Sequence, residues 1–157
     1  MTNIEIGKLN NLFIEAWNNH NADGMLALLD DDVEYRVSYA MGTYKGKEAI
    51  VNLIQQWVTA FPDLMYKAHN RMIADDMIFT EYEFTGTHRG ELSMFPELSE
   101  LEPTNWKVTY YGAYKLTCKN NKITEIVNYP DRFALFDQLG LLHNIDHVSY
   151  NANLASI

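Results

Sequence analysis

The sequence has little cysteine and few basic residues, and each shortage excludes a class of protein. Its single cysteine, Cys118, excludes an intrachain disulfide and a cysteine-based metal cluster in this 157-residue chain. Lysine and arginine number 12 against 21 aspartates and glutamates, which gives a net charge of -9. Nucleic acids and anionic membranes bind basic surfaces, so we expect no nucleic acid and no membrane among the partners.

Long hydrophobic runs are scarce too. No segment approaches the ~20 apolar residues of a membrane-spanning helix. The N-terminus also lacks the basic start and the apolar centre of a signal peptide. We therefore expect a cytoplasmic protein. The residues around Cys118 show the apolar alternation of a strand, which predicts a buried, inert thiol.

Aromatic residues, by contrast, are abundant at 13%. This share exceeds what a surface alone would use, and it indicates a large core, a pocket or a subunit interface. The length suggests one domain, which we place at residues 1–142. Residues 143–157 have weak periodicity, and we interpret them as a tail that is mobile or crosses to a partner subunit.

Apolar residues recur at helical spacing in two segments of the first half. Residues 6–20 predict one helix, and residues 47–61 predict a second, which ends before Pro62 because proline disfavours a helical conformation in the preceding residue. Between them, Asp23 is the expected N-cap of a short helix. Two further short features are a predicted turn at Asp30 to Asp32 and a predicted strand over residues 33–37.

The second half of the chain is mostly strand. Four runs are rich in β-branched and aromatic residues, at 64–73, 77–88, 106–118 and 123–129, and tight-turn residues between them predict antiparallel pairing. Helices followed by strands predict an α+β fold, in which a strongly curved antiparallel sheet wraps around the N-terminal helices and leaves a cone-shaped pocket. Two other features are a long excursion typical of a functional lid, 91–105, and a closing helix, 132–139.

Seven short segments occur in an order typical of one protein family. They are Phe13-Ile14-Glu15-Ala16-Trp17-Asn18, Asp30-Asp31-Asp32-Val33, Gly46-Lys47-Glu48-Ala49-Ile50, Ala60-Phe61-Pro62-Asp63-Leu64, Gly86-Thr87-His88-Arg89-Gly90, Pro103-Thr104, and Tyr129-Pro130-Asp131 followed by Gln138-Leu139-Gly140. In this order they resemble the SnoaL-like polyketide cyclases, within the nuclear transport factor 2-like (cystatin-like) superfamily of α+β cone-shaped barrels.

The resemblance implies a homodimer that binds a small hydrophobic carbonyl compound and uses no metal and no cofactor. It also implies acid–base chemistry, such as ring closure by aldol condensation on a polyketide ester or a related lyase or isomerase reaction. The same fold carries non-catalytic small-molecule-binding modules, so that alternative stays open. Two features depart from the family pattern: Pro130 directly precedes Asp131, and the excursion between Gly90 and Pro103 is longer.

Asp131 has two candidate roles. The resemblance implies that it is the acid–base group, and a carboxylate in an apolar cavity suits that work because desolvation raises its pKa. It also sits between a predicted strand and a predicted helix, where aspartate is a common N-cap worth about 1 kcal/mol. The sequence leaves both roles open.

The other candidate site residues lie on several predicted elements. His88 ends the strand on which Thr80, Tyr82 and Phe84 share one face, so it is a candidate to assist Asp131 or to bind a substrate carbonyl. Asn128 is a polar anchor if its face of the last strand points inward. Candidate pocket walls, which could equally be ordinary core, are Trp17, Tyr35, Trp57, Phe61 and Tyr82. The histidines show no paired metal-ligand spacing, so we expect no metal site.

Overall fold

The computed structural model describes residues 1–38, 42–98 and 100–142. Its helices are α1 (Asn3–Asn18), α2 (Ala22–Leu28), α3 (Lys47–Ala60) and α4 (Arg132–Gln138), with a short 3-10 turn η1 (Pro96–Leu98). Its strands are β1 (Leu29–Val37), β2 (Thr43–Lys45), β3 (Met65–Ala74), β4 (Met77–Thr87), β5 (Lys107–Lys119) and β6 (Lys122–Pro130). The tail predicted at 143–157 lies outside the described residues.

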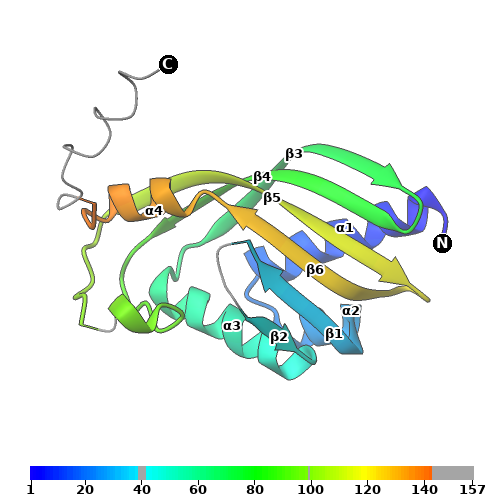
Figure 1. The fold of residues 1–157 in the computed structure, drawn as a ribbon, viewed down its shortest axis with the longest axis horizontal. Coiled ribbons are helices and arrows are strands. Elements are labelled where there is room, and N and C mark those ends of the chain that lie inside the picture. The colour runs from blue at the N-terminus through cyan, green and yellow to red at the C-terminus, as the bar shows by residue number, and fades with distance from the viewer. Residues whose placement is uncertain (39–41, 99, 143–157) are drawn as a thin grey trace, which may run out of the picture.

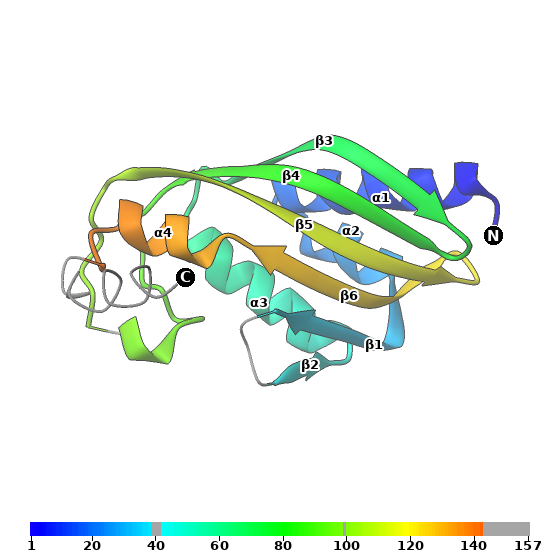
Figure 2. The same ribbon diagram turned by 45° about the horizontal axis from the view of Figure 1, so that its top comes forward.

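The strands form one sheet in the order β2-β1-β6-β5-β4-β3. The strands from β3 to β6 pair antiparallel as predicted, whereas β1 lies parallel to β6. Figures 1 and 2 show a curved sheet with α1, α2 and α3 on one side of it and α4 at the end of β6. The predicted α+β fold is confirmed, and the sheet stays open rather than closing into a barrel.

Side-chain alternation along the strands builds the core. On β4, Thr80, Tyr82 and Phe84 are buried on the face that meets the helices, and His88 follows in the same register. Cys118 on β5 is also buried, and burial raises the pKa of its thiol to about 11, as expected for an unreactive cysteine. No helix in the described part of the chain is long and apolar enough to cross a membrane.

The excursion before β5 is packed rather than open. Leu92 and Phe95 are buried in the core, and the Phe95 ring lies 5.4 Å from the ring of Phe136 on α4. The Arg132 guanidinium lies over the same Phe95 ring, at 5.1 Å. The segment therefore packs on the core and on the start of α4, and its role as a lid stays a prediction.

Two local predictions are wrong. The N-cap of α2 is Asn21, whose side-chain oxygen accepts the Gly24 N–H at 2.8 Å, and Asp23 lies in the first helical turn. The three aspartates from Asp30 to Asp32 belong to β1 and not to a turn. The aspartates lie in the irregular part of β1, where the β1–β6 register shifts between Leu29 and Glu34. The pairs on either side, Leu29 with Ile123 and Glu34 with Glu125, hold this run in the strand, although the Asp32 N–H still donates locally to Asp30 Oδ1 at 3.1 Å.

A charge cluster on the outer face joins three strands. The Glu125 carboxylate on β6 accepts from Lys115 Nζ at 2.7 Å and Thr117 Oγ1 at 3.1 Å on β5, and it pairs with Arg36 on β1. The Lys115 hydrogen bond is the largest cause that lowers the pKa of Glu125 to about 2, and burial opposes it. The folded state therefore holds Glu125 ionised far more strongly than the unfolded chain does.

Glu125→Gln should lower the free energy of unfolding at pH 7. A carboxylate whose pKa is depressed on folding stabilises the protein fully above its unfolded value near 4.5, and this contribution is lost as pH falls toward 2. The gap between wild type and variant in urea unfolding should therefore narrow from pH 5 to pH 2.5. Glu34→Gln, which removes a more exposed pair with Lys45, is the control with little expected effect. An equal gap at both pH values would contradict the assignment.

Candidate functional site

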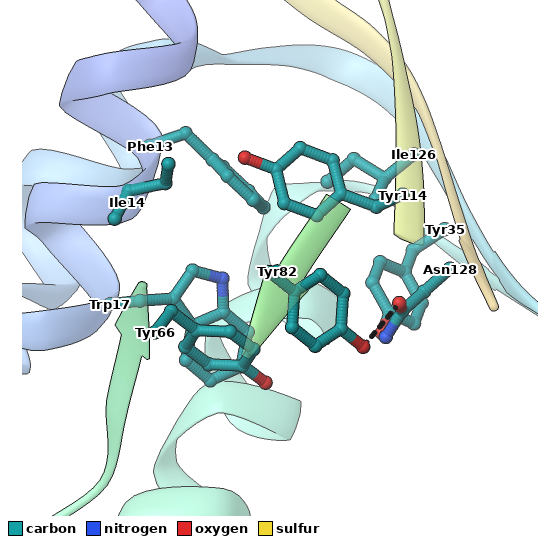
Figure 3. A pocket seen from close by; sticks show the side chains of 9 residues that line it. All are labelled: Phe13, Ile14, Trp17, Tyr35, Tyr66, Tyr82, Tyr114, Ile126 and Asn128. Atoms are coloured by element: carbon teal, nitrogen blue, oxygen red, sulfur yellow. Dashed lines mark hydrogen bonds between the residues drawn. The ribbon is translucent and has the colours of Figure 1, made fainter. Parts of the chain in front are cut away.

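An aromatic cavity lies between α1 and the inner face of the sheet. It has a volume of about 20 Å³, which is room for about one water molecule. Figure 3 shows the side chains converging on it from the helix on one side and the strands on the other. The lining residues are Phe13, Ile14, Trp17, Tyr35, Tyr66, Tyr82, Tyr114, Ile126 and Asn128.

Four of the predicted pocket residues line this cavity, namely Trp17, Tyr35, Tyr82 and Asn128. Trp57 and Phe61 do not. They stack on each other at 5.7 Å and pack against Phe84 in a neighbouring aromatic cluster. Sequence reasoning missed Phe13, Ile14, Tyr66, Tyr114 and Ile126, although helical spacing from Trp17 was a signal for Phe13 and Ile14 and strand alternation from Asn128 was a signal for Ile126.

Three polar side chains on three strands form a hydrogen-bonded relay along the cavity wall. The Tyr82 hydroxyl donates to Asn128 Oδ1 at 2.9 Å, and Asn128 Nδ2 donates to the Tyr35 hydroxyl at 3.1 Å. Hydroxyls, an amide and the Trp17 indole N–H are the polar groups of this wall, and burial raises the pKa of the nearby Tyr114 hydroxyl above its ordinary value. Hydroxyl and amide groups such as those of the relay can bind or polarise an oxygen atom by hydrogen bonding.

Asp131 lies at the end of β6, on the exposed surface. Its Oδ1 accepts the backbone N–H of Ala134 at 2.8 Å, so it is the N-cap of α4. The capping role that the sequence left open is thus present in the structure, and the acid–base role stays a prediction. Asp131 is not among the residues that line the cavity.

His88 is fully buried at the end of β4, with its ring 5.7 Å from the ring of Phe61. Its Nδ1 accepts the Thr104 backbone N–H at 3.2 Å, so the proton of the neutral ring is on Nε2. Nε2 is buried and makes no hydrogen bond of ordinary geometry to any described residue. Burial lowers the pKa of His88, and the backbone of Gly90 opposes this more weakly. Thr104 is a partner that sequence reasoning did not find.

The strand register keeps Asp131 and His88 apart. The Asp131 N–H donates to the carbonyl of Tyr111, and Tyr111 pairs with Glu83 on β4. Glu83 precedes His88 by five positions, which is roughly 16 Å of strand. The structure does not bring these two predicted catalytic groups together. No group of three or more histidine, cysteine or acidic side chains suited to a metal ion occurs among residues 1–38, 42–98 and 100–142.

A curved sheet with N-terminal helices on its inner side and an aromatic-lined cavity between them defines an α+β fold of the nuclear transport factor 2-like class. The family model described as SnoaL-like polyketide cyclase matches residues 8–139. The chain belongs to this family. A search of curated proteins gave no match.

Solved structures share the fold at low sequence identity. AclR from Streptomyces galilaeus superposes with a TM-score of 0.78 at 22% identity, covering 98% of this chain and 92% of that one. TsrD from Streptomyces laurentii gives 0.77 at 15% identity, with 90% and 99% covered. An LEH-like epoxide hydrolase from M. tuberculosis gives 0.68 at 17% identity, with 87% and 90% covered. At these identities the similarity establishes the fold and not the reaction.

The hydrogen bond from the Thr104 backbone N–H to His88 Nδ1 predicts a pH effect on stability. Because the pKa of His88 is lower in the folded protein than in the unfolded chain, its neutral form is fully present above pH 6.5, and stability falls as pH drops below that value. His88→Gln should cost about 1–3 kcal/mol at pH 8, through lost hydrogen bonding in a buried site. It should also flatten the decline between pH 6.5 and 5, as measured by urea unfolding.

His69→Gln is the matched control for that experiment. His69 is partly exposed on the outer face beside Glu83, so its replacement should leave the pH slope of wild type in place. A slope that persists in His88→Gln and vanishes in His69→Gln would contradict the role given to His88.

Proposed function

We propose that the protein binds a small hydrophobic carbonyl compound in the aromatic cavity and acts on it by acid–base chemistry without a cofactor. The reaction would be an aldol-type ring closure or a related lyase or isomerase step. The observation that carries the proposal is the relay of Tyr82, Asn128 and Tyr35, three hydrogen-bonded polar groups in a largely aromatic and aliphatic wall. Small-molecule sites commonly combine these two features. Membership of the SnoaL-like family supports the class of reaction.

A ligand has to move side chains to enter. The cavity of about 20 Å³ is far smaller than the roughly 300–1,000 Å³ of typical ligand pockets. Two partly exposed lining residues face each other where α1 meets the edge of the sheet. They are Ile14 on α1 and Tyr66 on the edge strand β3. We propose that the substrate enters at this seam between α1 and β3.

In this proposal Asp131 accepts a proton from the carbon beside a substrate carbonyl, and it later returns a proton to the oxygen that becomes a hydroxyl. Asp131 follows Asn128 by three residues, about 10 Å of extended chain. The substrate must therefore be long enough to reach from the relay to the end of β6, so the relay anchors a carbonyl away from the reacting carbon. In this proposal His88 does not transfer a proton, because its Nδ1 accepts the Thr104 backbone N–H. It assists by holding the segment around Thr104 in place.

The second candidate is a non-catalytic binding module on the same scaffold. Two observations favour it: the Asp131 carboxylate is engaged as a helix cap, and the lining residues include no carboxylate, histidine, lysine or arginine. Both candidates share ligand binding and differ in whether Asp131 moves a proton.

Replacing Asp131 in two ways separates capping from chemistry. Asn caps a helix about as well as Asp, whereas Ala does not. Asp131→Asn should therefore keep the stability of wild type, and Asp131→Ala should lose about 1 kcal/mol. The activity readout is hydrogen–deuterium exchange in D₂O, followed by NMR, of the terminal methyl-ketone protons of 1-phenyldecane-1,9-dione, whose second carbonyl can extend about 10 Å beyond the first, the span from Asn128 to Asp131. Wild type should accelerate this exchange over buffer, and both variants should lose the acceleration.

The two candidates give different outcomes here. Exchange by Asp131→Asn at the wild-type rate would remove Asp131 from the mechanism. If wild type binds this diketone without accelerating its exchange, the binding-module candidate takes the place of the enzyme.

A homodimer, in the cytoplasm, is also part of the proposal. The outer face of the sheet exposes large hydrophobic side chains: Met72, Phe79, Tyr111 and Tyr129. Between the two tyrosines lies a hollow of about 560 Å³ with Gly112 and Ala113 among its lining. Exposed aromatic side chains beside a hollow allow a second copy to pack by two-fold symmetry.

Light scattering at micromolar concentration should give twice the chain mass of 18.2 kDa. Tyr111→Glu should shift the protein toward the monomer, because it places a charge in the buried centre of the interface. Ile4→Glu, at an exposed position on α1 away from this face, is the control and should stay dimeric. A wild-type monomer would remove the dimer from the proposal.

A further inference from the structure

Tyr82 and Asn128 bond to each other although a whole strand separates them. Tyr82 is on β4 and Asn128 on β6, with β5 between. Neighbouring strands are about 4.8 Å apart, so the two backbones are nearly 10 Å from each other. Tyr82 bridges this span only if its ring lies flat across the inner face of β5. The 2.9 Å hydrogen bond shows that the Tyr82 hydroxyl reaches Asn128 Oδ1.

The residue that the ring crosses is Gly112. Gly112 is paired directly with Tyr82 in the antiparallel register of β4 and β5. A methyl group added there would lie 2.5 Å from the Tyr82 hydroxyl oxygen and 2.6 Å from Cζ. Carbon atoms never approach so closely without a shift, so any other residue at this position has to displace the phenol.

The displaced ring has one direction to go. The ladders of β4, β5 and β6 close the sheet side, Tyr114 stacks against the ring at 5.8 Å, and the cavity lies on the helix side. A side chain at 112 would push Tyr82 off the sheet and into the cavity. The hydroxyl would lose Asn128, and Asn128 would lose the partner that orients its amide toward Tyr35.

We infer that Gly112 is a positioning residue of the ligand site: the missing side chain lets Tyr82 lie across β5 and thereby orients the relay that binds a ligand oxygen. This inference rests on the proposed function, because the relay matters for specificity only if a ligand binds in the cavity. Gly112 acts through Tyr82 and does not itself touch the ligand.

The first test needs no ligand. The side-chain amide signals of Asn128, assigned by their loss in Asn128→Ala, report the hydrogen bond from Tyr82 in ¹H–¹⁵N NMR spectra. Gly112→Ala and Tyr82→Phe should shift these signals alike, because each removes that bond. Gly86→Ala is the matched control: it is also a strand glycine against an aromatic ring, Phe61, but lies away from the relay. Asn128 signals unchanged in folded Gly112→Ala would overturn the inference.

The second test measures selectivity. Acetophenone and ethylbenzene are flat probes of similar size, and only the first has a carbonyl oxygen. Binding is followed at the indole N–H signal of Trp17, which lines the cavity. Wild type and Gly86→Ala should prefer acetophenone about two- to tenfold, the range of one neutral hydrogen bond. Gly112→Ala and Tyr82→Phe should lose this preference.

The outcomes separate the inference from the proposed function. If neither probe affects Trp17 in wild type, the proposed function fails, and the Asn128 signals still decide the role of Gly112. If wild type binds both probes equally, the relay makes no favourable hydrogen bond to the carbonyl oxygen of acetophenone, and the inference is overturned. If Gly112→Ala does not fold, the double variant Tyr82→Ala/Gly112→Ala should fold, because the two shortest contacts of the new methyl group are removed and the remaining one, 3.0 Å to the Tyr129 carbonyl oxygen, needs only a small shift. A double variant that is no more stable would also overturn the inference.

Discussion

Two asparagine side chains hold α1 on the sheet. Asn18 donates to the Tyr66 carbonyl at 2.9 Å and accepts the Tyr66 N–H at 2.7 Å, which satisfies both backbone groups at one position of the edge strand. Asn10 is fully buried and accepts from Thr80 and Tyr114. Apolar contacts are non-directional, so these polar contacts set the register of the helix. That register decides which side chains of α1 form a wall of the cavity.

The inner wall and the strand ends differ in electrostatic character. The cavity is lined by neutral aromatic, aliphatic and amide groups, whereas the ionisable candidates stand at the far ends of β4 and β6. His88 is held neutral by burial, and Asp131 is engaged at the start of α4. Binding and proton transfer are therefore spatially separate in this fold, and only a substrate that extends from the cavity to the end of β6 could connect them.

Local periodicity was enough to predict most of the elements. The helices around Phe13 and Trp57, and the strands β4, β5 and β6, follow from side-chain spacing because each buries one face. The edge strand β3 has no buried residue and was predicted from its β-branched and aromatic content. Asp30 to Asp32 were misread because they form the irregular part of β1, between residues that pair with β6 at Leu29 and from Glu34 onward, and no local pattern encodes that pairing. The family could be predicted because the matching segments are local and ordered. The relay could not, since it depends on the mutual register of β4, β5, β6 and β1.

The relay also indicates which side of the cavity is fixed. Tyr82, Asn128 and Tyr35 are on strands joined by backbone ladders, so moving any of them breaks hydrogen bonds along with packing. On the opposite side, Trp17 and Tyr66 meet across a seam fastened by the Asn18 amide and by a hydrogen bond from Arg71 to Asn11. A seam of three hydrogen bonds opens at far lower cost than a six-stranded ladder. A ligand that enlarges the cavity of about 20 Å³ therefore displaces the residues on the α1 side. It binds against the sheet side, which keeps its position.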